Sequence, residues 1–167
     1  MLTFVQDSPA TPTPNVPDMS SEVPMTPVAA FPELAYRDGA AAVTWLEQAL
    51  GFERLFVVDG DGGGVLHAEL ACGSTVVMLE SVGSGNEHGM RSPLDLPGTT
   101  GCVCIAVDDP DQRCARVREA GGVVVTEPFD TPYGARSGVV RDPEGHVWVI
   151  STHRPHQAPQ PSRRPAP

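Results

Sequence analysis

The chain has 167 residues, with 11 basic and 21 acidic side chains and a formal net charge of −10 at pH 7. A chain of this length accommodates one domain with a core of useful size. No stripe of basic side chains offsets the acidic balance, so a phosphate backbone would be repelled and we expect no nucleic-acid partner.

Both ends of the chain are rich in proline and polar residues and show no periodic apolar pattern. Such segments bury too little surface to offset the entropy of ordering, which predicts disordered tails at residues 1–27 and 155–167. Residues 28–154 then form a single domain. The sequence shows no targeting signal and no run approaching ~20 apolar residues, so we expect a cytoplasmic protein without membrane contact. Three methionines are candidate translation starts: Met1, Met19 and Met25.

The cysteines contain no pair at the CxxC spacing and no secretory context accompanies them. We therefore expect no disulfide framework and reduced thiols within the core. The four residues are Cys72, Cys102, Cys104 and Cys114.

The first half of the domain predicts a strand, a helix and three further strands. An apolar strand at 31–38 ends at Asp38, which can cap the following helix. This helix carries one apolar stripe and ends at Gly51. Glycine-rich turns separate the remaining strands, which are predicted at 52–58, 64–71 and 74–80.

The second half repeats this order. A strand at 101–109 leads to a helix that begins at Asp109, has Pro110 at its first helical position and ends at Gly121. The sequence Asp142-Pro143-Glu144-Gly145 predicts a tight turn between the last two strands. The three strands after this helix are predicted at 123–128, 137–142 and 146–152.

The order β-α-β-β-β therefore occurs twice, in modules at about 31–80 and 101–153. We expect an α+β fold in which one helix covers one face of each sheet. The opposite faces of the two sheets then form a cupped, mixed β-sheet around a common cavity. Segment 81–100 is rich in glycine, proline and polar residues, which predicts a mobile flap at the cavity mouth.

This order resembles the vicinal oxygen chelate superfamily, which includes glyoxalase I, bleomycin-resistance proteins and extradiol dioxygenases. The resemblance covers residues 28–154 and is closest to the glyoxalase-like, bleomycin-resistance-like branch. It implies a small-molecule ligand, a homodimer and a role of the antibiotic-resistance type, but the superfamily includes both enzymes and binding proteins. Four stretches carry it: LAYRDGAAAVTWLEQALGFE, HAELACGSTVVML, IAVDDPDQRCARVREAGG and TPYGARSGVVRDPEGHVWVISTH.

Alternation along each strand predicts which side chains face the cavity. We expect Trp148 and Ile150 to pack under a helix and their neighbours to face inward. Tyr133 and Arg136 precede the last hairpin, where a loop could bring Arg136 to an anionic or carbonyl group of a ligand or leave it in solvent. The residues predicted to face the cavity are Phe31, Glu33, Ala35, Val65, His67, Glu69, Cys102, Cys104, Ala106, Val147, Val149 and Ser151.

The resemblance also indicates where metal-dependent members hold a divalent cation, which acts as a Lewis acid on the substrate. The corresponding positions here are Phe31, Glu69, Cys102 and Val149. Phe31 and Val149 cannot coordinate a metal, so we expect no cofactor. An offset site stays open, since four inward side chains would suit zinc if they converged within ~2.0–2.3 Å of one point. These are Glu33, His67, Glu69 and Cys102.

Two functions remain open. The first is a binding protein that sequesters an antibiotic-like or metabolite ligand between apolar walls with few polar groups. The second is a glyoxalase-like lyase or isomerase acting on a small oxygenated metabolite, with Glu69 as base or metal ligand and His67 beside it. His67 and Glu69 can also form a plain polar patch. The missing metal ligands favour the binding protein, and the residues leave open whether the cavity closes within one chain or across a dimer.

Overall fold

The computed structural model describes residues 29–83 and 89–155. The predicted tails lie outside these residues apart from Pro155, and so does His88 of the predicted flap. The domain forms one compact unit that begins at Phe31. None of the helices in the described part of the chain has both the length and the apolar character needed to span a bilayer.

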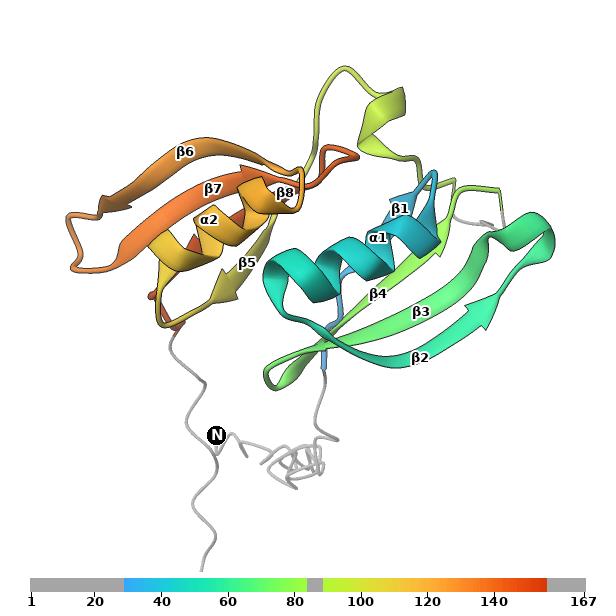
Figure 1. The fold of residues 1–167 in the computed structure, drawn as a ribbon, viewed down its shortest axis with the longest axis horizontal. Helices are drawn as coiled ribbons and strands as arrows, with labels where there is room; N and C mark the ends of the chain where they lie inside the picture. Colours follow the sequence, from blue (N-terminus) through green and yellow to red (C-terminus); the bar gives the residue numbers. More distant parts are fainter. Residues whose placement is uncertain (1–28, 84–88, 156–167) are drawn as a thin grey trace, which may run out of the picture. The chain divides into compact units, whose positions relative to one another are not determined.

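The first module is a four-stranded sheet with helical structure against one face (Figure 1). Strand β1 (Glu33–Tyr36) leads into helix α1 (Gly39–Trp45), which continues as the π-helical turn η1 (Leu46–Leu50). Strand order is β1-β4-β3-β2, with β1 parallel to β4 and the other neighbours antiparallel. The remaining strands are β2 (Glu53–Asp59), β3 (Val65–Cys72) and β4 (Thr75–Ser81), and the 3₁₀ turn η2 (Asp61–Gly63) joins β2 to β3.

The second module has the same topology. Strand β5 (Val103–Ala106) leads into helix α2 (Pro110–Glu119), and the strands pair in the order β5-β8-β7-β6. β5 runs parallel to β8, and the other neighbours are antiparallel. The remaining strands are β6 (Val123–Asp130), β7 (Arg136–Arg141) and β8 (Val147–Ser151), and the 3₁₀ turn η3 (Pro93–Asp95) lies between the modules. The predicted pair of βαβββ modules is confirmed.

The helix ends follow the predicted chemistry. Asp38 accepts a hydrogen bond from the backbone N of Ala41 at 2.9 Å, and Asp109 accepts one from Gln112 N at 2.9 Å. These are N-cap interactions, which satisfy backbone donors that have no partner within the helix. Gly51 ends η1 with φ of 72°, a left-handed conformation that favours glycine.

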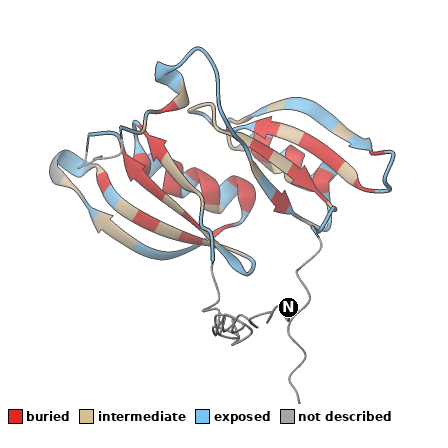
Figure 2. Ribbon diagram, turned by 180° about the vertical axis from the view of Figure 1, so that it is seen from behind, coloured by how far each residue is buried: buried red, intermediate tan, exposed pale blue. Residues whose placement is uncertain are grey.

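One core serves both modules. It lies between the helices and the sheet faces that they cover, and Figure 2 shows buried residues along the helices and the central strands. The ring of Phe52, beside the end of η1, meets the edge of Trp148 in β8 with centroids 5.7 Å apart. Between the helices, Arg116 of α2 donates a hydrogen bond to the carbonyl of Gln48 at 2.5 Å. The two sheets are therefore joined through their helical faces.

The predicted turn between β7 and β8 is present and also bonds to the first module. Glu144 accepts hydrogen bonds from the backbone N of Arg37 at 2.7 Å and of Asp38 at 2.8 Å. Ser92, in the segment between the modules, donates to the same carboxylate at 2.6 Å. A further ion pair joins Arg37 to Asp95. Side-chain hydrogen bonds and an ion pair therefore connect residues 92–95 to both modules, and the mobility of the segment remains a prediction.

Candidate functional site

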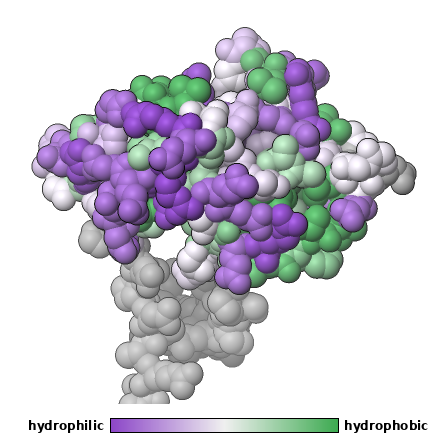
Figure 3. Space-filling view, viewed as in Figure 1, coloured by the Kyte–Doolittle hydropathy of each residue, from purple (hydrophilic) through white to green (hydrophobic). Residues whose placement is uncertain are grey.

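Each sheet has one face that its helix covers and an opposite face that it leaves uncovered, which we call the open face. The alternation of buried and exposed residues along the strands defines it. In Figure 3, hydrophobic residues gather at the surface over β2 and along β6, while a hydrophilic band covers α2. The large side chains that are exposed on or beside the open faces are Phe31, Phe56, Leu66, Val123 and Phe129.

The open face of the first sheet carries one polar pair. His67 Nε2 and Glu69 Oε1 lie 3.3 Å apart, with side chains 31% and 40% exposed. The ring of Phe56 on the neighbouring strand lies 6.4 Å from the His67 ring. The predicted pairing of His67 and Glu69 on one face is therefore present, and an apolar ring flanks it. An imidazole in contact with a carboxylate can hold or move a proton.

Val65 does not lie on this open face, contrary to the prediction. It is 2% exposed, and its Cβ lies where a side chain at Gly39 of α1 would collide. Its backbone N donates to Ser81 Oγ at 2.9 Å. The register between β2 and β3 shifts between the pairs Val58–His67 and Asp59–Val65, so strict alternation fails at the start of β3.

The open face of the second sheet is largely apolar. Trp148 and Ile150 are fully buried under α2, as predicted, which leaves Val147, Val149 and Ser151 on the opposite face. Ser151 is 7% exposed and its hydroxyl bonds to the carbonyl of Arg136 at 3.3 Å. Val149 is thus flanked by further small or apolar side chains.

The cysteines divide into two groups. Cys114 is fully buried, as expected of a core thiol, and Cys72 is half-buried. Cys102 and Cys104 are both exposed on the open face of the second sheet, so the expectation of core thiols is wrong for this pair. Burial and then the neighbouring Cys102 raise the pKa of the Cys104 thiol.

Arg136 lies on the opposite side of its sheet from the predicted site. Its guanidinium forms two hydrogen bonds with Asp111 of α2, at 2.6 and 2.7 Å, and one with Asp130 at 3.1 Å. Arg136 shares the face that α2 covers with Gly138 and Val140 of β7. Of the two predicted alternatives, the structure therefore agrees with a partly exposed surface charge and not with a contact to a ligand in the cavity. Tyr133 is exposed in the β6–β7 turn, with its ring 5.6 Å from that of His153.

The candidate ligands of an offset metal site do not gather at one point. Within residues 29–83 and 89–155, no group of three or more histidine, cysteine or acidic side chains is arranged to hold a metal ion. Of the four candidates, only His67 and Glu69 are in contact, while Glu33 lies on β1 and Cys102 precedes β5 in the other module. The expected lack of a metal cofactor remains a prediction.

The sequence reasoning missed several residues that share the open faces. Phe56 pairs with Glu69 across β2 and β3, Val139 pairs with Val149, and Phe129 pairs with Ser137. The predicted hairpin would have found Val139, because the pairing of β7 with β8 places it opposite Val149. Phe56 and Phe129 were harder to assign, because register shifts interrupt both β2 and β6.

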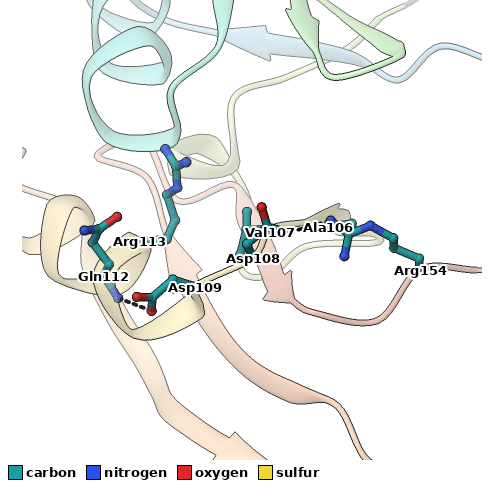
Figure 4. Close-up of a pocket in the computed structure, with 7 residues that line it drawn as sticks. All are labelled: Ala106, Val107, Asp108, Asp109, Gln112, Arg113 and Arg154. Atoms are coloured by element: carbon teal, nitrogen blue, oxygen red, sulfur yellow. Dashed lines mark hydrogen bonds and ion pairs between the residues drawn. The ribbon is translucent and has the colours of Figure 1, made fainter.

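Two hollows in the described residues lie away from these side chains. The first, of about 340 Å³, lies where β5 meets α2, and Figure 4 shows Arg113 extending from it toward the other helix. The second is about 50 Å³ and lies between α1 and the β7–β8 turn, against Trp45 and Asp142. Of the side chains predicted to face the cavity, Ala106 lines the first hollow and none lines the second.

Comparison with known proteins agrees with this architecture. The uncharacterized protein Mb0911c of Mycobacterium bovis is 35% identical over 120 residues, which cover 71% of this chain and 79% of that protein. The putative glyoxylase CFP32 of the same organism is 34% identical over 98 residues, covering 56% of this chain and 37% of its own length.

Solved structures show the same fold. TioX from Micromonospora sp. ML1 aligns with a TM-score of 0.60 at 34% identity, over 77% of this chain and all of that one. A glyoxalase-related enzyme from Fulvimarina pelagi aligns with a TM-score of 0.59 at 21% identity, over 74% of this chain and 86% of its own. The family model described as Glyoxalase/Bleomycin resistance protein/Dioxygenase superfamily matches residues 28–150. With its two βαβββ modules and this match, the chain belongs to the glyoxalase/bleomycin resistance protein/dioxygenase superfamily.

Proposed function

We propose that the protein sequesters a planar, partly apolar small molecule, an antibiotic-like compound or a metabolite, against its open sheet faces. The observation that carries this proposal is the set of large apolar side chains exposed there, among them Phe31, Phe56 and Phe129. Ligand sites in proteins combine apolar walls with a small number of orienting polar groups. His67 and Glu69 provide such groups, and Val149 provides apolar wall at a position where metal-dependent relatives carry a ligand.

The proposed site is completed by a second copy of the chain in a homodimer. Phe31, Phe56 and Phe129 are between 45% and 53% exposed, which is costly for aromatic rings in water. A face of this kind on a partner chain would cover them and enclose a ligand between the sheets. The proposed compartment is the cytoplasm, where the free thiols of Cys102 and Cys104 would stay reduced.

Light scattering on the purified chain tests the dimer. We expect a dimer for the natural sequence and a monomer for Phe129→Glu, because a carboxylate covered by an apolar partner surface is desolvated without a partner. Ala40→Glu is the matched control, since Ala40 is exposed in the first turn of α1, where an acidic side chain is favourable. A monomeric natural chain would contradict this part of the proposal.

A second candidate function rests on the contact between His67 and Glu69. Their 3.3 Å separation within an apolar surround suits proton transfer to or from a small oxygenated metabolite, as in a lyase or isomerase. In that case Glu69 is the base and His67 orients it. Conversion of the bound compound distinguishes this reaction from simple sequestration.

One assay compares the binding protein with the enzyme. The chain is titrated with a fluorescent probe, 8-anilinonaphthalene-1-sulfonate, and planar antibiotics then displace the probe. For a binding protein, Val149→Glu should weaken binding by roughly 1–3 kcal/mol, because the new charge is buried without a partner. Glu69→Gln should change the affinity far less, and Ala40→Glu again serves as control. Mass spectrometry of each displacing compound after overnight incubation should recover it unchanged. A compound that is consumed by the natural chain but not by Glu69→Gln establishes the enzyme instead.

A further inference from the structure

Two neighbouring thiols lie at the edge of the second sheet. Cys102 directly precedes β5 and Cys104 is the second residue of that strand, so both side chains leave the same face. Both residues are exposed, and one residue separates them along the chain. We call Cys102 and Cys104 the dithiol pair.

Packing does not account for the dithiol pair. Cysteine is among the most buried residue types, and Cys114 of the same module follows that rule. Cys104 instead stands on the open face, beside Val149 of β8. Ala106 and Ser151 lie near it on that face, and neither carries a charge with which the thiol would pair.

A disulfide does not suit this spacing. Residues two apart in a strand are separated by roughly 6.6 Å, and their Cβ atoms by about as much when both point the same way. A disulfide needs Cβ atoms about 3.5–4.5 Å apart. A single atom bonded to both sulfurs fits better, since two bonds of about 2.3 Å, the length of a zinc–sulfur bond, let the two sulfurs stay farther apart than a direct S–S bond does.

We propose that the dithiol pair is a capture site for thiophilic centres that take two sulfur ligands, namely trivalent arsenicals and soft metal ions. With an arsenical oxide, two As–S bonds form and the arsenic–oxygen bond breaks. The oxygen leaves as water with both thiol protons, and arsenic remains trivalent. No oxidant or reductant is needed. Soft ions prefer thiolate ligands for the same reason.

A centre that bonds to both sulfurs replaces the two thiol protons at once. The site shares the open face with the proposed ligand site, but it does not require the sheets to enclose a ligand.

Phenylarsine oxide and the reduced full-length chain provide the test, read by native mass spectrometry. We expect one adduct per chain, with the mass of the arsenical less one water. The adduct should survive excess 2-mercaptoethanol and be removed by 1,2-ethanedithiol, because only a dithiol competes with two bonds from one chain. In excess 2-mercaptoethanol, the natural chain should retain the adduct almost completely, and Cys102→Ser and Cys104→Ser should each lose it almost completely. Cys72→Ser and Cys114→Ser should retain the adduct.

Circular dichroism confirms that each variant is folded, which is expected for the two exposed positions. If Cys114→Ser is unfolded, Cys72→Ser alone serves as the control. The proposal would be overturned if the natural chain formed no adduct or if the adduct joined two chains. It would also be overturned if Cys102→Ser and Cys104→Ser both retained the adduct in full. Binding of 8-anilinonaphthalene-1-sulfonate is measured separately. A natural chain that does not bind this probe but retains the arsenical would refute the sequestration function and leave the dithiol site intact.

Discussion

Replacement of Asp142 by asparagine is the most stringent test of how the two modules are held together. The Asp142 carboxylate is 3% exposed. One oxygen accepts from Tyr36 Oη at 2.7 Å and Trp148 Nε1 at 3.2 Å. The other accepts from the backbone N of His146 at 2.9 Å and of Glu144 at 3.1 Å. The residue therefore joins β1 of the first module to the last hairpin of the second.

Asparagine keeps the shape of the side chain but replaces one acceptor oxygen with a donor. In one orientation Trp148 loses its acceptor and the Tyr36 hydroxyl must reverse, and in the other two backbone donors face the new NH₂ group. A hydrogen bond to a charged group contributes about 1.5–3 kcal/mol, and a buried donor left unsatisfied adds to that cost. We expect Asp142→Asn to lower the free energy of unfolding by about 2–4 kcal/mol, a large part of a total near 5–15 kcal/mol.

Urea unfolding followed by tryptophan fluorescence measures this difference by linear extrapolation. Asp130→Asn is the matched control, because the side chain of Asp130 is 84% exposed and its ion pair with Arg136 is solvated. A change below about 0.5 kcal/mol for Asp142→Asn, the usual range for surface substitutions, would refute the reasoning. So would equal losses in the two variants.

Three other substitutions test separate features of the fold. Burial, and next the charge of Asp142, raise the pKa of Tyr36 well above its usual value near 10. The contribution of Tyr36 to stability is therefore fully present below pH ~10 and is lost as the pH rises from there toward the pKa in the folded chain. Urea unfolding should detect this loss in the natural chain and not in Tyr36→Phe. In Gly122→Ala the new Cβ would lie 2.9 Å from the backbone oxygen of Arg141, so we expect a loss of about 1–3 kcal/mol in the same assay, and an unchanged midpoint would contradict the close packing. Arg136→Gln removes exposed ion pairs and should leave the urea midpoint unchanged within error, whereas a clear shift would show that these pairs hold the sheet to α2.

The sequence alone predicted the element order, both helix caps and the last turn. Each of these depends on local chemistry that a few adjacent residues contain. Asp38 and Asp109 cap their helices because a carboxylate can reach a backbone N three residues on. Trp148 and Ile150 pack under α2 because bulky residues alternate with smaller ones along β8.

Only the tertiary structure decided which of the predicted site residues share a face. A register shift in β2 and β3 turned Val65 under α1, and a shift of this kind depends on the partner strand rather than on the local pattern. Arg136 lies on the helical side of its sheet, where it pairs with Asp111, which is 25 positions away in the sequence. Alternation had placed Cys102 and Cys104 on one face, and the structure shows that this face leaves both side chains exposed. The sequence contained Val65 and Arg136, but the strand that pairs beside Val65 and the carboxylate that pairs with Arg136 are brought to them only when the chain folds.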